Sequence, residues 1–220
     1  QLLYPVMPEK TKTILNILGA GFIPLSDTSI GLLTAGIKLS EGKSPFPRIV
    51  YWMTLIDTHA HIYYDDYADC MDDIIQSAAD NGVEKIISIG VDLKSSEKCI
   101  KLAEKYESVY ATCGIHPHES DKAEKKYLYQ LEEFISHPKV VAIGEIGLDY
   151  YYDLSDRKNQ RKKYHEQLEM ANSINFPVVV HCRDSDNDIL IGIQESCHNL
   201  GVIHCFASNL DFAEKILKTG

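Results

Sequence analysis

The chain has 220 residues, 45% of them hydrophobic and 25% charged, a composition that predicts a folded globular protein and argues against extensive disorder. Its formal net charge is −10, and residues 53–220 carry 17 Lys and Arg against 29 Asp and Glu. This net negative charge repels the phosphate backbone of nucleic acid at long range, which argues against a protein that coats DNA without sequence preference. A nucleic-acid partner would have to be held by metal ions or by a local basic face.

Cysteine usage and hydropathy predict a cytoplasmic protein without a membrane partner. The six cysteines form no C-x-x-C pair and several lie in apolar runs, so we expect buried free thiols in a reducing compartment. The apolar tract ILNILGAGFIPL near the N-terminus is broken by Asn, Gly and Pro and is shorter than the roughly 18 to 20 residues of a membrane span. It also lacks the basic lead-in of a signal peptide.

The first 52 residues predict a helix over 8–18, a Gly/Ser-rich turn region and an extended segment, KSPFPRIV, with no catalytic constellation. From residue 54 onward, short apolar runs alternate with charged amphipathic stretches. We expect strands at 54–57, 85–91, 109–115, 140–148, 177–182 and 201–206. We expect helices at 66–82, 95–106, 121–136, 156–174, 185–197 and 211–218.

Six successive β-then-α units predict an α/β fold with a parallel sheet covered by helices. A (β/α)8 barrel or an open doubly wound sheet would both fit, but polar side chains close five of the six strands, which favours a ring of converging strand ends. A TIM-type barrel takes about 250 residues, and residues 53–220 supply fewer. The expected fold is therefore an incomplete (β/α)8 barrel that lacks its last two units.

Four histidines and one glutamate fall at or beside the predicted C-terminal strand ends: His59, His61, Glu145, His181 and His204. A single histidine beside an apolar run is more often a structural residue. In a barrel, however, the strand ends meet at one mouth, where these five side chains would converge. Imidazole and carboxylate are ligands for Zn, Mn or Fe, and a carboxylate can bridge two ions. Two ions about 3.5 to 4 Å apart can activate a water and bind a phosphate. The alternative interpretation is that Glu145 forms a salt bridge with a Lys or Arg of the barrel.

Two further side chains are candidates for substrate contact. His116 in GIHPH ends the third strand, and a structural turn is the alternative interpretation. Arg183 follows His181 and could bind a phosphate through two N–H groups, or could instead pair with Asp184. The basic run DRKNQRKK (156–163) is compatible with nucleic-acid binding, but a solvated helix face accounts for it as well.

Several motifs together resemble the TatD family of metal-dependent deoxyribonucleases: DTHAHI, GIHPH, GEIGLDYYYD, RKNQRKKYHEQLEMA, PVVVHCRD and IHCF, over residues 53–220. The resemblance implies a TIM barrel in which His59 and His61 hold one divalent ion and His181 and His204 hold a second. Catalytic Glu145 would bridge the two ions (Mg, Mn or Zn). It also implies hydrolysis of DNA phosphodiesters, as a 3'–5' exonuclease.

The chain departs from the family pattern in two places. The family's final motif, whose Asp ligates the first metal and can act as the general base, is expected beyond residue 220, so we expect the chain as given to be inactive or feeble. Phe206-Ala207-Ser208 stands where the family commonly has Phe-Ser-Gly, which alters the expected shape of that loop.

Residues 1–50 resemble something else, because LLYPVMPEKTKTILNILG and SPFPRI are similar to the end of the anticodon-binding domain of methionyl-tRNA synthetase. We therefore expect two regions, a synthetase-like remnant over 1–52 and the hydrolase barrel over 53–220. Trp52 directly precedes Met53, so either two neighbouring genes have been read as one or the segment is a true fusion.

The leading functional hypothesis is thus a two-metal hydrolase that acts on DNA ends. A same-fold alternative is a hydrolase of another bond, such as an amide or the ester of D-aminoacyl-tRNA. A third hypothesis is an RNA-binding appendage, in which tRNA is bound only through the N-terminal remnant.

Overall fold

The computed structural model describes residues 55–219. The expectations for residues 1–52, namely the synthetase-like remnant, its helix at 8–18, its tRNA partner and the junction at Trp52, lie outside the described residues.

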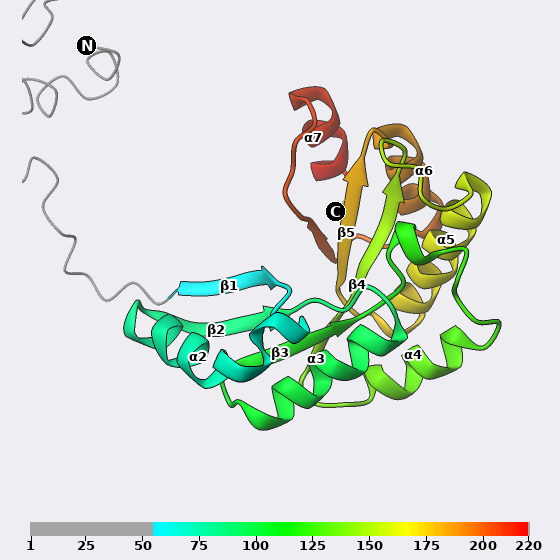
Figure 1. Cartoon of the computed structure of the whole chain (residues 1–220). Coiled ribbons are helices and arrows are strands. Elements are labelled where there is room, and N and C mark those ends of the chain that lie inside the picture. The colour runs from blue at the N-terminus through cyan, green and yellow to red at the C-terminus, as the bar shows by residue number, and fades with distance from the viewer. Residues whose placement is uncertain (1–54, 220) are drawn as a thin grey trace, which may run out of the picture. The chain divides into compact units, whose positions relative to one another are not determined.

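Six parallel strands form one sheet in the order of the sequence, and the sheet curls into part of a barrel (Figure 1). The strands are β1 (Leu55–Ala60), β2 (Val83–Ser88), β3 (Val109–Cys113), β4 (Val140–Asp149), β5 (Val178–Arg183) and β6 (Gly201–Ile203). Each strand pairs in parallel with the next one along the chain. An incomplete TIM-type barrel is therefore confirmed, and the open doubly wound sheet is not what forms.

Helices connect the strands, and α2 to α6 lie on the convex side of the sheet (Figure 1). The α-helices are α2 (Met71–Asp80), α3 (Leu93–Lys105), α4 (Tyr127–Ile135), α5 (Arg157–Ile174), α6 (Asp186–Ser196) and α7 (Leu210–Leu217). Residues 55–219 also contain two short 3-10 helices, η1 (Asp65–Cys70) and η2 (Pro117–Glu119). Side-chain caps fix three of the helix starts, because Asp92, Asp156 and Asn209 accept hydrogen bonds from the first turns of α3, α5 and α7.

The structure differs from the sequence prediction at two helix starts. The stretch predicted as a helix from residue 66 begins as the 3-10 helix η1, and α2 starts only at Met71. The helix predicted from residue 121 starts at Tyr127. The start of the predicted helix is not helical because Asp121 is bound elsewhere. Its carboxylate accepts hydrogen bonds from the backbone N–H of Asp156 and from the side chain of Asn159.

The hydrophobic core lies between the sheet and the helices in two adjoining clusters. One joins β2 and β3 to α3 and α4, and it includes Ile86, Cys99, Val109 and Leu131. The other joins β4 and β5 to α5 and α6, and it includes Ile143, Leu168, Val180 and Ile189. The central strands are consequently buried on both faces, as their continuous apolar runs predict.

All six cysteines are free thiols, as expected. The prediction that they are buried is correct for Cys99 and Cys113 and wrong for Cys70, Cys197 and Cys205, which are exposed. Over residues 55–219, the helices are all too short or too polar to cross a membrane.

Candidate metal centre

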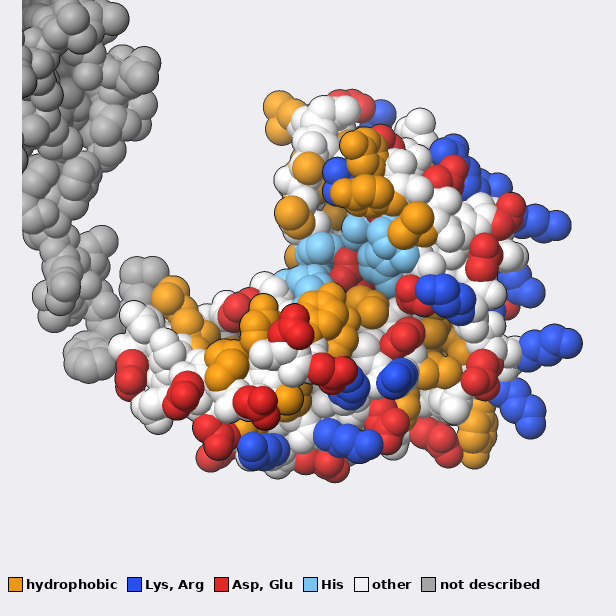
Figure 2. Space-filling view, viewed as in Figure 1, with side chains coloured by type: hydrophobic (Ala, Val, Ile, Leu, Met, Phe, Trp, Pro, Cys, Tyr) orange, Lys and Arg blue, Asp and Glu red, His pale blue; other side chains and the backbone are white. Residues whose placement is uncertain are grey.

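The C-terminal strand ends meet in a hollow on the molecular surface, and histidine side chains gather in it around an acidic group (Figure 2). The Glu145 carboxylate lies among these histidines, and its side chain is buried. Two residues further along β4, the strands β4 and β5 approach each other closely at Gly147, which pairs with His181. Gly147 has a φ of +134°, and a Cβ on it would lie 2.0 Å from the His181 carbonyl oxygen, so only glycine fits there.

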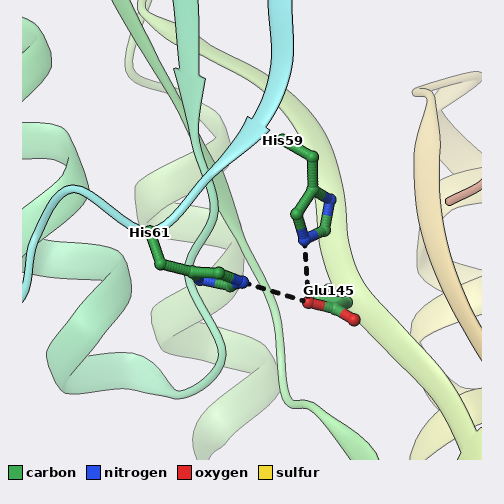
Figure 3. Close-up of side chains that lie close together, drawn as sticks. All are labelled: His59, His61 and Glu145. Atoms are coloured by element: carbon green, nitrogen blue, oxygen red, sulfur yellow. Dashed lines mark ion pairs between the residues drawn. The ribbon is translucent and has the colours of Figure 1, made fainter. Parts of the chain in front are cut away.

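One oxygen of Glu145 faces His59, which lies near the end of β1, and His61, which follows β1. The side chains of His59 and His61 both point toward this oxygen (Figure 3). The Nε2 atoms of His59 and His61 lie 3.3 and 3.9 Å from Oε2 of Glu145. These three side chains could hold a metal ion, because one ligand atom from each lies within 4.8 Å of the others.

The other oxygen of Glu145 faces His181 on β5, His204 directly after β6 and His116 in the loop after β3. Oε1 lies 2.9 Å from Nδ1 of His181 and 2.6 Å from Nε2 of His204. Nε2 of His116 lies 3.5 Å from the same oxygen. His116, Glu145 and His181 form a second group with metal-binding geometry. The distance from His116 to the carboxylate therefore falls within the range of 2.6 to 3.9 Å covered by the four proposed histidine ligands.

Burial and charge set the protonation of these groups. Burial alone would raise the pKa of Glu145, but its contacts with the surrounding imidazoles of His116, His181, His204 and His59 outweigh burial and hold that pKa far below the ordinary value. Burial lowers the pKa of His61 and His116, which favours neutral imidazoles that can bind a metal. Burial opposes protonation of His181 as well, but its contacts with the carboxylates of Glu145 and Asp149 raise its pKa.

The surroundings of His59 indicate whether these side chains are suited to binding a metal ion. Both of its ring nitrogens are buried without a hydrogen-bond partner, since the 3.3 Å contact with Glu145 does not have hydrogen-bond geometry. Buried polar atoms without partners are costly and uncommon. The ring also stacks on His204 at 3.9 Å between centroids. A cluster of partly buried imidazoles around one buried carboxylate is a donor set suited to Zn or Mn, so these side chains are suited to binding a metal ion.

Arg183 lies at the end of β5, and its guanidinium rests over the rings of Tyr151 and Tyr152. Among the ion pairs of residues 55–219, none joins Arg183 to Asp184, which was the alternative reading of this residue. The other basic candidate, the run at 156–163, forms the start of α5. There Arg157 pairs with Asp153 and Arg161 with Asp188, consistent with a solvated helix face.

Two further residues belong to this cluster: Asp149, which the sequence analysis missed, and His118, the last residue of the GIHPH motif, to which it assigned no role. Asp149 is fully buried at the end of β4, and its Oδ2 lies 3.1 Å from Nε2 of His181 and 2.8 Å from Nε2 of His118. The signal was available, because residues 145 and 149 are four apart on a strand and therefore share a face. A carboxylate behind a metal-binding histidine fixes the orientation and proton position of its ring.

Two glutamines of α5 hold the strand ends that carry these groups. The buried amide of Gln160 accepts a hydrogen bond from the backbone N–H of Asp149 and donates to the carbonyl oxygens of Asp149 and Ser155. Gln167 makes the same pair of bonds to Ile115, next to His116. Gln160 and Gln167 thus hold the backbone next to the metal centre in place through hydrogen bonds from α5.

The fold and the centre together place the protein in a class of TIM-type barrels that carry a cluster of imidazoles around a buried carboxylate at the C-terminal mouth. A family model described as "TatD related DNase" matches residues 56–220, and the chain belongs to this family. The resemblance inferred from the motifs is thereby confirmed for this region.

Similar proteins include the "Uncharacterized metal-dependent hydrolase YabD" of Bacillus subtilis, which is 32% identical over 74% of this chain and 65% of its own length. The "3'-5' ssDNA/RNA exonuclease TatD" of Shigella flexneri is 30% identical over 76% of this chain and 65% of its length. The crystal structure of YJJV, a TatD homolog from Escherichia coli K12, superposes with a TM-score of 0.72 and 31% identity, covering 77% of this chain and 66% of that one. The chain thus spans about 65% of the length of these curated relatives.

Proposed function

We propose that the barrel hydrolyses phosphodiester bonds of single-stranded nucleic acid, as a 3'–5' exonuclease, with two divalent metal ions. The observation that carries the proposal is the division of contacts on Glu145. One carboxylate oxygen faces His59 and His61, while the other faces His181 and His204. This arrangement suits a carboxylate that bridges two ions.

Each residue then has a defined part in the proposal. His59 and His61 would hold one ion and His181 and His204 the other, with Glu145 between them. Divalent ions bound there would supply an activated water and neutralise charge on the phosphate. Asp149 holds the His181 ring in place, and Arg183 offers N–H donors to the substrate. We assign His116 to substrate contact, although it lies within reach of the same carboxylate oxygen.

The choice of substrate rests on the relatives. A relative named "3'-5' ssDNA/RNA exonuclease TatD" matches 76% of this chain. The same-fold alternative, hydrolysis of an amide or of a D-aminoacyl ester, would use the same donors, so an assay of both substrates must decide between them.

The test is an assay of the full chain with Mn²⁺, Mg²⁺ or Zn²⁺ on a 5'-labelled single-stranded DNA, with D-aminoacyl-tRNA as the rival substrate. We expect slow stepwise shortening from the 3' end, because the family's final aspartate is expected beyond residue 220. Glu145→Gln should lose at least about a hundredfold of this activity, since the centre loses its shared charged ligand. Glu169→Gln, an exposed glutamate on α5, is the matched control and should retain activity.

Calorimetric titration of the metal supplies a readout that does not depend on turnover. We expect two ions per chain, weakened binding in Glu145→Gln and in His181→Ala, and nearly unchanged binding in His116→Ala. Undiminished cleavage by Glu145→Gln, or hydrolysis of D-aminoacyl-tRNA in place of DNA, would contradict the proposed function.

A further inference from the structure

Two tyrosines and an arginine lie together beside the metal centre. Tyr151 and Tyr152 follow β4, and Arg183 ends the neighbouring strand β5. The Cζ atom of Arg183 lies 4.4 Å from the ring centroid of Tyr151 and 4.8 Å from that of Tyr152. The two rings are 4.9 Å apart and nearly perpendicular. We call these three side chains the tyrosine–arginine group.

The tyrosine–arginine group is fixed to the centre through Asp149. One oxygen of the Asp149 carboxylate holds the His181 ring, and the other accepts hydrogen bonds from the backbone N–H groups of Tyr151 and Tyr152. The ring of Tyr152 also packs edge-on against His118 at 5.8 Å between centroids. The same buried carboxylate therefore sets the position of a proposed metal ligand and of both tyrosines.

Within residues 55–219, the polar groups of these three side chains are available to bind a ligand. The Arg183 side chain makes neither a hydrogen bond nor an ion pair within residues 55–219, so its guanidinium N–H donors are free while its plane rests on the rings. Tyr151 and Tyr152 are 59% and 54% exposed, and hydrophobic side chains flank the histidine hollow on the visible face (Figure 2). Tyr150 provides the contrast, since its hydroxyl donates to Asp188 and its ring lies under Arg157.

We propose that the tyrosine–arginine group is a nucleotide subsite, in which the tyrosine rings stack on an unpaired base and the Arg183 guanidinium binds the attached phosphate. This inference rests on the proposed function and names the side chains that select the substrate. Aromatic faces bind any base of a single strand by stacking, and a guanidinium binds phosphate oxygens through parallel N–H donors. A base inside a duplex does not offer its face, so the subsite selects single strands.

The test compares two labelled decanucleotides, a single-stranded oligothymidylate and the same strand with abasic residues at its 3' end. Binding to the full chain is followed by fluorescence anisotropy in EDTA at low salt. We expect the wild type to prefer the strand that carries bases. Tyr151→Ala combined with Tyr152→Ala should weaken binding of that strand at least about fivefold and leave the abasic strand nearly unaffected.

Further variants separate stacking from damage to the fold. Tyr151→Phe with Tyr152→Phe keeps the rings and should retain the preference, whereas Arg183→Ala should weaken binding of both strands. Tyr129→Ala removes a tyrosine on α4 that is 63% exposed and should change neither affinity. Circular dichroism and the melting temperature of each variant show whether the barrel is intact.

The outcomes separate this inference from the proposed function. Equal affinity of the wild type for the two strands, no measurable binding of either, or an equal loss for both strands in the tyrosine variant overturns the subsite. DNA cleavage that depends on Glu145 without base preference would sustain the enzyme and reject the subsite. Base preference that depends on the tyrosines without hydrolysis would sustain the subsite and reject the enzyme.

Discussion

The central and outer strands of the sheet both contribute donors to the centre, but they hold them differently. Glu145 and His181 stand on β4 and β5, whose residues are largely buried between neighbouring strands and helices. His59 lies near the end of β1, His61 follows β1, and His204 follows β6. Both strands are mostly exposed and have one neighbour in the described sheet. The central donors are thus fixed by packing, whereas the outer donors depend on a single ladder of hydrogen bonds.

The largest expected difference between central and outer strands is in packing. Ile143→Ala on β4 empties a fully buried site and should lower the free energy of unfolding by about 2–5 kcal/mol. Ile56→Ala on β1 removes a side chain that is 51% exposed and should change it by no more than about 0.5 kcal/mol. Urea denaturation of the two variants measures both values, and equal losses would show that β1 is as tightly packed as β4.

The next effect concerns the side-chain hydrogen bonds that fix the end of β4. Gln160→Leu leaves backbone groups of Asp149 and Ser155 buried without partners and should destabilise the fold by about 1–3 kcal/mol. Gln194→Leu, at an exposed position on α6, is the control and should have little effect. Matching denaturation midpoints for these two variants would remove the assigned role of Gln160.

A smaller effect is expected from Asp149→Asn, which keeps the shape of the side chain but removes the charge that orients His181. Affinity for Zn²⁺, measured by calorimetry, should fall about 10- to 100-fold, as for other residues that support a metal ligand. Asp66→Asn, an exposed residue of η1, should leave the affinity unchanged. Unaltered affinity in Asp149→Asn would mean that β5 alone holds His181 in place.

The sequence predicted the repeating units and the convergence of the strand ends because both depend on local patterns. Alternating apolar runs and amphipathic stretches indicate parallel β/α units, and in a barrel the ends of such strands share one mouth. The start of α4 could not be predicted, because it depends on hydrogen bonds between Asp121 and the distant residues Asp156 and Asn159.

The supporting residues of the centre were harder to predict than the proposed ligands. Gln160 and Gln167 lie in a polar, charged helix, yet both are fully buried, and only the folded chain shows the strand ends to which they bond. Asp149 could have been found from its four-residue spacing from Glu145. The contact between Arg183 and the tyrosines required the register of β4 and β5, which pairs Asp149 with Arg183.

The close contact between Gly147 and the His181 carbonyl has a consequence for mutational screens. A single methyl group added at position 147 must push β5 away from β4, and the imidazole of His181 moves with its strand. Such a substitution would disturb the donor cluster without altering any charge, ligand atom or hydrogen-bonding side chain. A screen for lost activity would therefore return a position that has no chemistry of its own, and backbone spacing would be the reason.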